Sequence, residues 1–324
     1  MRAMRVHELS DDISVLRLEE VELPPPGPGE VRLDLKACSV NFPDILMVQG
    51  KYQFKPALPF SPGMEGAGVV AALGPDVTKL KVGDRVVAGL RIGGFAEAVN
   101  ISEDACRPIP GKMDFAKAAA YPAAYLTAYV ALVCRGRLQS GETLLVHGST
   151  GGVGLAAVEM GKLLGATVIA TSASDEKLKV VTQRGADHVV NVNDGFREKV
   201  KELTDGRGAD VIYDPVGGDI FDESVRCIAW NGRLLIIGFT SGRIPTVSVN
   251  MPLIKGFSVV GVRAGEYGRR DPKAGKANIE AVDRLAAEGR IDPYICARFP
   301  LERAVDAMRM LQERKVVGKV VIEM

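Results

Sequence analysis

The sequence predicts an α/β protein of two domains, an irregular β-barrel followed by a doubly wound parallel sheet. Residues 1 to about 120 contain short apolar runs such as "VRLDLKACSV" and "GDRVVAGL", separated by Gly, Pro and Asp, which is typical of a barrel. From residue 141 onward, apolar runs alternate four times with helical stretches, which favours a parallel sheet with right-handed crossovers. The 324 residues suffice for two cores, because one core seldom grows beyond about 250 residues.

The domain boundaries follow from changes in this pattern. Near residue 116 the chain changes to "AKAAAYPAAYLTAYVALVC", in which small and apolar residues recur at helical spacing. We therefore assign residues 1–123 to the barrel domain and 124–264 to the parallel-sheet domain. Residues 265–324 contain a long helix candidate and a closing helix and strand, which we expect to return to the first domain.

The composition argues against several classes of partner. The 41 Lys and Arg against 40 Asp and Glu leave a net charge of +1, so neither nucleic acid nor an anionic membrane is expected, and a small ligand fits better. The first ten residues lack the apolar core of a secretory signal, and no window approaches 18 unbroken apolar residues. Five cysteines stand far apart and never as CxxC, which indicates a reducing compartment, and we expect a soluble cytoplasmic protein.

The segment "VHGSTGGVGLAA", residues 146–157, lies between an apolar run and a helical stretch. Gly148 and Gly151 permit a tight turn, Gly152 lets the backbone approach a phosphate, and Gly154 lets the helix pack closely on the sheet. An anion would then bind N–H groups at the positive end of the helix dipole. The loop predicts a dinucleotide pyrophosphate site formed by Ser149, Thr150, Gly151, Gly152, Val153 and Gly154.

The choice of dinucleotide depends on the end of the next strand. An NAD site usually presents an acid to the ribose there, about 20 residues beyond the glycines. Here "TVIATSAS" ends in small hydroxyl residues that include Ser172, and the first acid, Asp175, begins a helix in "SDEK". Ser172 and Lys177 leave room and positive charge for a 2′-phosphate, which favours NADPH over NADH. The alternative for Lys177 is a solvated helix lysine.

The chain resembles the zinc-independent, zeta-crystallin-like quinone oxidoreductases of the medium-chain dehydrogenase/reductase superfamily. The resemblance covers essentially the whole chain through "SVNFPDILMVQGKY", "PFSPGMEGAGVV", "KVGDRVVA", "PAAYLTAYVAL", the glycine loop and "VIYDPVGG". It implies a GroES-like β-barrel catalytic domain, a Rossmann domain, a cleft between them and a homodimer.

The resemblance also bears on zinc. Zinc-dependent relatives carry a cysteine and a histidine where this chain has Asn41 and Met64, and an amide and a thioether are poor zinc ligands. The four closely spaced cysteines of the relatives' structural zinc lobe are also missing after "GDRVVAGL". We therefore expect no zinc. The three histidines, His7, His147 and His188, are isolated and are interpreted as structural or exposed.

The remaining site residues are carried over from the resemblance. Tyr52 matches a tyrosine that protonates or hydrogen-bonds the product in enone reductases, Asn41 a residue beside the nicotinamide ribose or the substrate, and Thr127 a nicotinamide contact. Each has a structural alternative: an aromatic filling its loop for Tyr52, and polar groups bonded within their own elements for the other two. The looser assignments are Phe239 and Thr240 beside the nicotinamide, Val262 at its carboxamide, and Arg314 at the 2′-phosphate.

One departure weakens the preference for NADPH. Several NADPH-using relatives have a tyrosine in an "NY" pair after the third strand, whereas this chain has Asn191 followed by Val192. One expected phosphate contact is therefore missing, and the predicted preference is moderate.

The predicted chemistry is reduction. Without a Lewis acid, alcohol oxidation needs another way to lower the hydroxyl pKa, whereas hydride addition to a quinone or enone needs only alignment and a proton source. We predict an NADPH-dependent, zinc-free quinone reductase with Asn41 and Tyr52 as catalytic residues. The alternatives are a reductase of conjugated enones, alkenals or enoyl thioesters, and a protein that binds NADPH without turnover in a structural or nucleic-acid-associated role.

Overall fold

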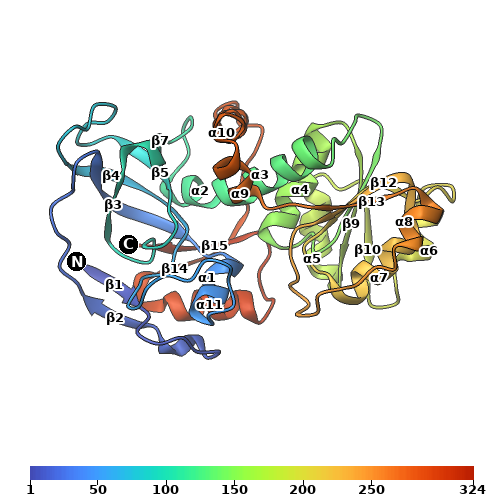
Figure 1. Cartoon of the computed structure of the whole chain (residues 1–324), viewed down its shortest axis with the longest axis horizontal. Helices are drawn as coiled ribbons and strands as arrows, with labels where there is room; N and C mark the ends of the chain where they lie inside the picture. Colours follow the sequence, from blue (N-terminus) through green and yellow to red (C-terminus); the bar gives the residue numbers. More distant parts are fainter. The chain divides into compact units, whose positions relative to one another are not determined.

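A computed structural model describes all residues from Met1 to Met324 and divides into two compact units (Figure 1). Unit 1 comprises Met1–Pro122 and Ala286–Met324, and unit 2 comprises Ala123–Leu285. The sequence predicted the second boundary after residue 264, whereas in the structure it lies after Leu285. Residues 265–285 hold most of helices α9 (Ala264–Arg270) and α10 (Pro272–Ala287), and the α10 residue Asn278 accepts a hydrogen bond from Cys134 of unit 2 (Sγ to Oδ1, 3.5 Å).

Unit 1 is built on a seven-stranded sheet that is antiparallel except for one pair. The strand order is β14-β15-β3-β4-β5-β7, and β6 also pairs with β3. In β3, Val31, Leu33 and Leu35 are buried and alternate with less buried residues, as expected for a strand with one face on a core. The strands are β3 (Glu30–Ser39), β4 (Glu65–Leu73), β5 (Arg85–Gly89), β6 (Ala98–Ser102), β7 (Cys106–Pro108), β14 (Ile295–Pro300) and β15 (Lys319–Glu323).

The last segment of the chain completes this sheet. Strand β15, drawn in red, pairs with the blue β3, and β14 pairs parallel with β15 across helix α11 (Ala304–Gln312) (Figure 1). The predicted return of the last helix and strand to the first domain therefore matches the observed pairing. The other elements of unit 1 are the hairpin β1 (Arg2–Arg5) and β2 (Arg17–Glu20), helices α1 (Phe42–Val48) and α2 (Phe115–Ala120), and short 3₁₀ turns at Ile13–Val15, Glu103–Ala105 and Leu301–Arg303.

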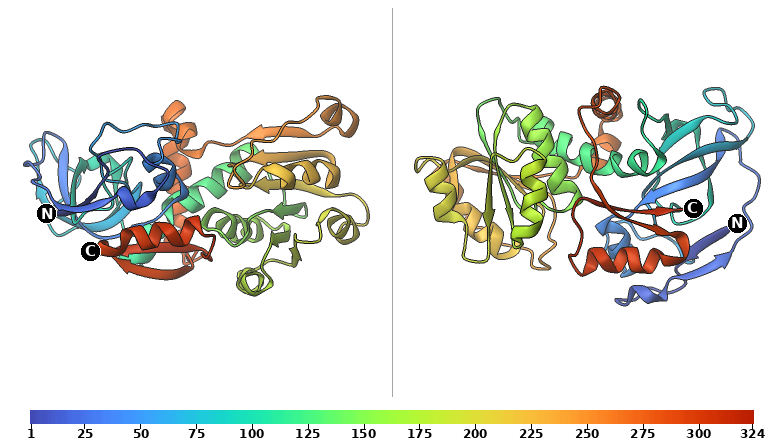
Figure 2. Two further views of the ribbon diagram at one scale, coloured as in Figure 1. Left: turned by 90° about the horizontal axis from the view of Figure 1, so that it is seen from below. Right: turned by 180° about the vertical axis from the view of Figure 1, so that it is seen from behind.

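Unit 2 is a six-stranded parallel sheet with the order β10-β9-β8-β11-β12-β13. The order reverses direction between β8 and β11, which is the switch point of a doubly wound sheet. Helices lie on both faces of the sheet, as Figures 1 and 2 show. The predicted α/β class, with a doubly wound parallel sheet in the second unit, is confirmed. The strands are β8 (Thr143–Val146), β9 (Thr167–Ser172), β10 (His188–Asn191), β11 (Ala209–Asp214), β12 (Ile228–Ile236) and β13 (Ser258–Gly261).

The helices of unit 2 follow the βα alternation read from the sequence. They are α3 (Pro122–Tyr129, whose first residue belongs to unit 1), a π-helical segment Val130–Arg135, α4 (Gly152–Leu163), α5 (Asp175–Gln183), α6 (Arg197–Leu203), α7 (Gly218–Cys227), α8 (Asn250–Lys255), α9 and α10. None of the helices combines the length and the apolar character that a membrane span requires.

Candidate functional site

The glycine loop joins the end of β8 to the start of α4, where the sequence predicted it. Gly148 has φ +53°, a conformation that side chains other than glycine rarely adopt. A Cβ on Gly154 would lie 2.2 Å from the carbonyl oxygen of Gly148, so the first turn of α4 packs on the loop more closely than any side chain would permit. These glycines are therefore required by the backbone geometry itself.

The N-terminus of α4 has no side-chain cap. Its N-cap residue is Gly151, in extended conformation, and no side chain accepts a hydrogen bond from the first turn. The first N–H groups of a helix have no partner within the helix and carry the positive end of its dipole. An anion such as a pyrophosphate would satisfy them, so the loop and the first turn of α4 fit a dinucleotide.

Two residues beside the loop anchor it to the sheet. Ser149 is fully buried and donates from Oγ to the carbonyl oxygen of Thr171 at 2.9 Å. His147 is also fully buried, with its two ring nitrogens 2.8 Å from Oγ1 of Thr171 and 2.8 Å from Oγ of Ser224. Burial lowers the pKa of His147 to about 3, so the imidazole is neutral. It is a structural residue, one of the two interpretations that the sequence left open.

A second loop lies beside the glycine loop at the carboxyl edge of the sheet. The Asp214 carboxylate, at the end of β11, accepts the N–H groups of Val216 (2.8 Å) and Gly217 (2.9 Å) through one oxygen. A Cβ on Gly148 would lie 3.3 Å from the Pro215 side chain and 3.2 Å from that of Val216. The two loops thus meet at the switch point between β8 and β11, the usual place for a ligand in such sheets.

Two residues predicted to read the 2′-phosphate, Ser172 and Lys177, lie at the end of β9 and in the first turn of α5. Ser174 caps α5 by accepting the N–H of Lys177 at 3.4 Å, which matches the helix start read from "SDEK". The Asp175 carboxylate accepts a hydrogen bond from Asn191 Nδ2 at 2.9 Å, so the first acid after β9 is held by the neighbouring strand. Ser172 ends β9. Arg314 belongs to unit 1, where it follows α11 with φ +56°.

The residues predicted to contact the nicotinamide lie in unit 2, with Thr127 in helix α3 and Phe239, Thr240 and Val262 in the segments after β12 and β13. The Thr127 hydroxyl donates to the carbonyl oxygen of Ala123 in its own helix at 2.7 Å, so its hydrogen is already committed. Thr240 follows β12 and donates its N–H to Pro215 at 3.1 Å, next to the partly exposed Phe239. Val262 follows β13 and donates its N–H to Ile236 at 3.0 Å.

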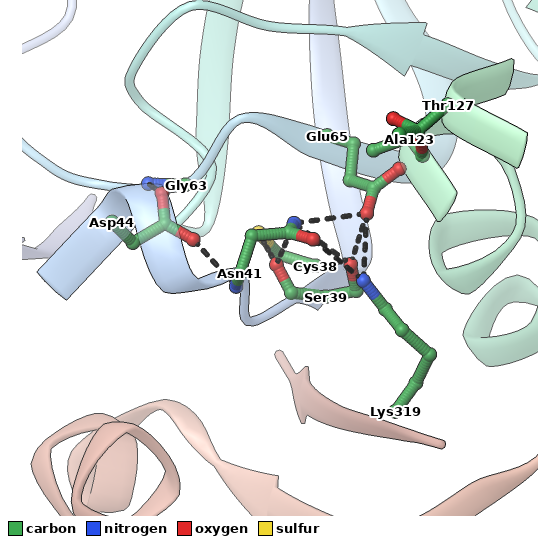
Figure 3. Close-up of polar contacts among 9 residues, drawn as sticks. All are labelled: Cys38, Ser39, Asn41, Asp44, Gly63, Glu65, Ala123, Thr127 and Lys319. Atoms are coloured by element: carbon green, nitrogen blue, oxygen red, sulfur yellow. Dashed lines mark hydrogen bonds and ion pairs between the residues drawn. The ribbon is translucent and has the colours of Figure 1, made fainter. Parts of the chain in front are cut away.

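In unit 1, Asn41 lies in a polar cluster at the start of α1 (Figure 3). Lys319 Nζ donates to Asn41 Oδ1 at 2.7 Å, and Asn41 Nδ2 donates to Glu65 Oε1 at 2.9 Å. Lys319 and Glu65 form an ion pair at 3.2 Å although their side chains are only 6% and 2% exposed. The buried Ser39 hydroxyl also donates to Glu65 Oε1. We call Ser39, Asn41, Glu65 and Lys319 the Asn41 cluster.

Asp44 joins the cluster to the loop before β4. Its carboxyl group is fully buried and accepts the N–H groups of Asn41 (2.8 Å) and Gly63 (3.0 Å). Burial raises the pKa of Asp44 to about 7, against the opposing effect of these hydrogen bonds. Asp44 thereby fixes the backbone of Asn41, while the cluster fixes its side chain.

Met64 and Asn41, which stand where zinc-dependent relatives have zinc ligands, are engaged in packing and hydrogen bonding. Met64 is partly buried and packs against the apolar core of unit 1, and Asn41 is engaged by Lys319 and Glu65. No three His, Cys, Asp or Glu side chains gather anywhere in the chain as a metal site. Tyr52 is half-buried against the same core, and its N–H donates to the carbonyl oxygen of Leu46 at 3.1 Å.

The sequence pattern indicated Asn41 but not Ser39, Asp44, Glu65 or Lys319. Two signals were present: a glutamate opening the otherwise apolar segment "EGAGVVAAL", and a lysine opening "KVVIE". A charge at the buried end of an apolar strand needs a partner, which the sheet supplies. In the register, Ser39 pairs with Val321, and Cys38 with Gly66, so the ends of β3, β4 and β15 meet.

Comparison with known proteins gives consistent matches. Residues 27–111 match the family model described as alcohol dehydrogenase GroES-like domain, and residues 152–282 match zinc-binding dehydrogenase. The chain is 42% identical over 301 residues to a quinone oxidoreductase-like protein 2 homolog from Nematostella vectensis (91% of this chain, 82% of that one). It is 40% identical over 311 residues to the mouse quinone oxidoreductase-like protein 2 (95% and 89%). A mycobacterial protein solved as a complex with NADPH superposes with a TM-score of 0.91 at 31% identity, over 100% of both chains.

Proposed function

Because the chain belongs to the quinone oxidoreductase family of the medium-chain dehydrogenase/reductase superfamily, it is an NAD(P)-dependent oxidoreductase, and we propose that it reduces a quinone with NADPH and without zinc. The observation that carries the proposal is the glycine turn at the switch point of unit 2, with the uncapped N-terminus of α4 behind it. When bound, NADPH supplies a hydride to the substrate.

The chain's own residues would hold the dinucleotide through backbone groups. The N–H groups of Gly152, Val153 and Gly154 open α4 and would bind the pyrophosphate, while Ser149 and Thr150 shape the turn before them. Thr127, Phe239, Thr240 and Val262 remain the proposed nicotinamide contacts.

The proposed preference for NADPH rests on charge at the end of β9. Ser172 ends that strand, and Lys177 lies in the first turn of α5, where it would attract a 2′-phosphate. Arg314, in unit 1, is proposed for the same phosphate from the resemblance alone. The hydrogen bond from Asn191 holds the Asp175 carboxylate at the neighbouring strand, which limits its freedom to accept from a ribose hydroxyl as NAD sites require.

Zinc independence is supported by the chemistry of the donors. An amide and a thioether stand at the compared positions, and the Asn41 amide is bonded by Lys319, whose positive charge disfavours a second cation nearby. Asn41 and Tyr52 are the proposed substrate-facing residues. A reduced quinone can take its proton from water, so the chain need not hold a strong acid.

Steady-state oxidation of NADPH tests this proposal. The expected result is turnover with para- and ortho-quinones, slower turnover with conjugated enones, and a lower kcat/KM with NADH. A preference for NADH of tenfold or more, equivalent to about 1.4 kcal/mol, would contradict the roles of Ser172 and Lys177.

A substitution at Tyr52 distinguishes an enone reductase from a quinone reductase. If an enone is the substrate, Tyr52→Phe removes the proposed proton donor and lowers kcat for enones while quinone turnover remains. A Tyr294→Phe variant, which removes a phenol elsewhere in unit 1, is the control. Equal rates for the wild type and Tyr52→Phe with every enone would remove Tyr52 from the mechanism.

We also propose a homodimer formed through β13. This strand ends the sheet of unit 2, so one side of its backbone is unpaired, and exposed apolar side chains gather in the segments around it. They are Trp230 (69% exposed), Ile244 (70%), Val249 (84%), Leu253 (80%), Ile254 (65%) and Val259 (40%). Sedimentation should show a dimer that Leu253→Glu dissociates, and a monomeric wild type would refute it. None of the five cysteines forms a disulfide, which supports a cytoplasmic location.

A further inference from the structure

The amide of Asn41 lies between partners of opposite polarity (Figure 3). The Lys319 ammonium, 2.7 Å from Oδ1, can only donate hydrogen bonds. The ion-paired Glu65 carboxylate, 2.9 Å from Nδ2, accepts them. The two ends of the amide therefore cannot be exchanged, and the orientation of Asn41 is set by the charges of its neighbours.

The hydrogen-bonding capacity left on Asn41 can be counted. One N–H of Nδ2 bonds Glu65, and the other faces Ser39, whose Oγ is 3.3 Å and whose carbonyl oxygen is 3.4 Å away. The Ser39 hydroxyl donates to Glu65, so its oxygen is free to accept from Asn41. Oδ1 has two lone pairs, and Lys319 uses one. What remains for a ligand is one acceptor site on Oδ1.

We infer that Lys319 is a positioning residue that holds Asn41 as a hydrogen-bond acceptor, so that Asn41 recognises a hydroxyl group of its ligand. This inference rests on the proposed function for the identity of the ligand. The hydroxyl belongs either to the ribose of the bound nucleotide or to the hydroxylated substrate or product. A quinone carbonyl has no hydrogen to donate, so Asn41 does not polarise it.

The burial of the cluster explains why the orientation is held. The Lys319 and Glu65 side chains are only 6% and 2% exposed, so neither charge can turn to water, and each is satisfied by the other and by the amide between them. Lys319→Met alone leaves a buried carboxylate without its cation and can unfold unit 1. Lys319→Met combined with Glu65→Gln removes both charges and keeps the shapes, which makes it the informative variant.

The test is a cycle between this pair of changes and Asn41→Ala. The NADPH dissociation constant and the kcat/KM for a quinone at saturating NADPH are measured for the wild type, Lys319→Met/Glu65→Gln, Asn41→Ala and the triple variant. When Asn41 is present, the pair should either raise the dissociation constant or lower kcat/KM about tenfold, as expected for the loss of one well-aligned hydrogen bond. When Asn41 is absent, the change should be less than about twofold. Lys319→Arg, which keeps a donor, should recover part of the loss.

The outcomes separate the possible sources of the hydroxyl. Coupling in the dissociation constant assigns it to the nucleotide ribose, and coupling only in kcat/KM assigns it to the substrate or product. Lys117→Met removes an exposed lysine paired with Asp292 in the same unit and should change neither quantity. Equal losses with and without Asn41, or no loss, overturn the inference. A wild type that binds NADPH but reduces no quinone or enone refutes the proposed function instead, and the dissociation constants then decide the inference alone.

Discussion

Acid should destabilise unit 2 through His147. This imidazole is fully buried, and burial lowers its pKa from 6.5 to about 3. Between these two values the unfolded chain takes up a proton that the folded chain does not, so stability is lost as the pH falls below about 6.5. From pH 8 to pH 5, a group with these two pKa values costs about 2 kcal/mol of unfolding free energy.

The measurement compares urea unfolding of the wild type and His147→Gln at both pH values, followed by circular dichroism and by the single tryptophan, Trp230, which lies in unit 2. At pH 8 the variant should be less stable, because Gln replaces a ring bonded to Thr171 and Ser224. At pH 5 this deficit should shrink by about 2 kcal/mol, since only the wild type meets the protonation cost. Other titrating groups cancel in the difference.

The exposed His188, in β10, supplies the control. His188→Gln also removes one imidazole but leaves His147 in place, so it should keep the pH dependence of the wild type. A difference between the wild type and His147→Gln that stays constant within about 0.5 kcal/mol from pH 8 to pH 5 would show that His147 is protonated in the folded protein or reached by water.

Two further predictions concern the packing of unit 2. Gly154→Ala places a Cβ 2.2 Å from the Gly148 carbonyl oxygen, so it should lower the free energy of unfolding by about 1–3 kcal/mol and weaken NADPH binding. The control is Gly151→Ala, whose Cβ would lie 3.5 Å from the same oxygen and which should leave the melting temperature nearly unchanged. Equal melting temperatures for the two variants would disprove the close approach. The Tyr213 hydroxyl is buried without a hydrogen-bond partner, so Tyr213→Phe should stabilise the protein by about 1 kcal/mol and raise the urea midpoint. A lower midpoint would show that the hydroxyl makes a stabilising hydrogen bond in solution.

The sequence was informative where structure depends on neighbouring residues. The strand, glycine turn and helix around residues 146–157 are local, and α4 begins at Gly152, within the predicted segment. The start of α5 was equally readable, because Ser174 and the acids after it form a cap within four residues. Such features need no knowledge of distant segments, so their residues could be numbered in advance.

Long-range packing was less accessible. The helical pattern of residues 272–291 predicts a helix here, which the structure forms as α10, but it does not show which unit most of the helix packs on. For that reason the predicted boundary lies earlier than the observed one. Asn41 and Lys319 are 278 positions apart and meet only through the register of β15 on β3. Their contact depends on a strand pairing that no local pattern encodes.

The polarity of Asn41 bears on which substrates the enzyme can reduce. The resemblance to quinone oxidoreductases supplies the position of Asn41, but the direction of its hydrogen bonds follows from Lys319 and Glu65. If Asn41 only accepts, it gives no electrophilic help to a carbonyl, and His147, neutral and enclosed in unit 2, does not supply that help. Simple ketones, which need polarisation before hydride addition, should then be poor substrates. Quinones are already electron-poor and regain aromaticity on reduction, so they need alignment more than activation.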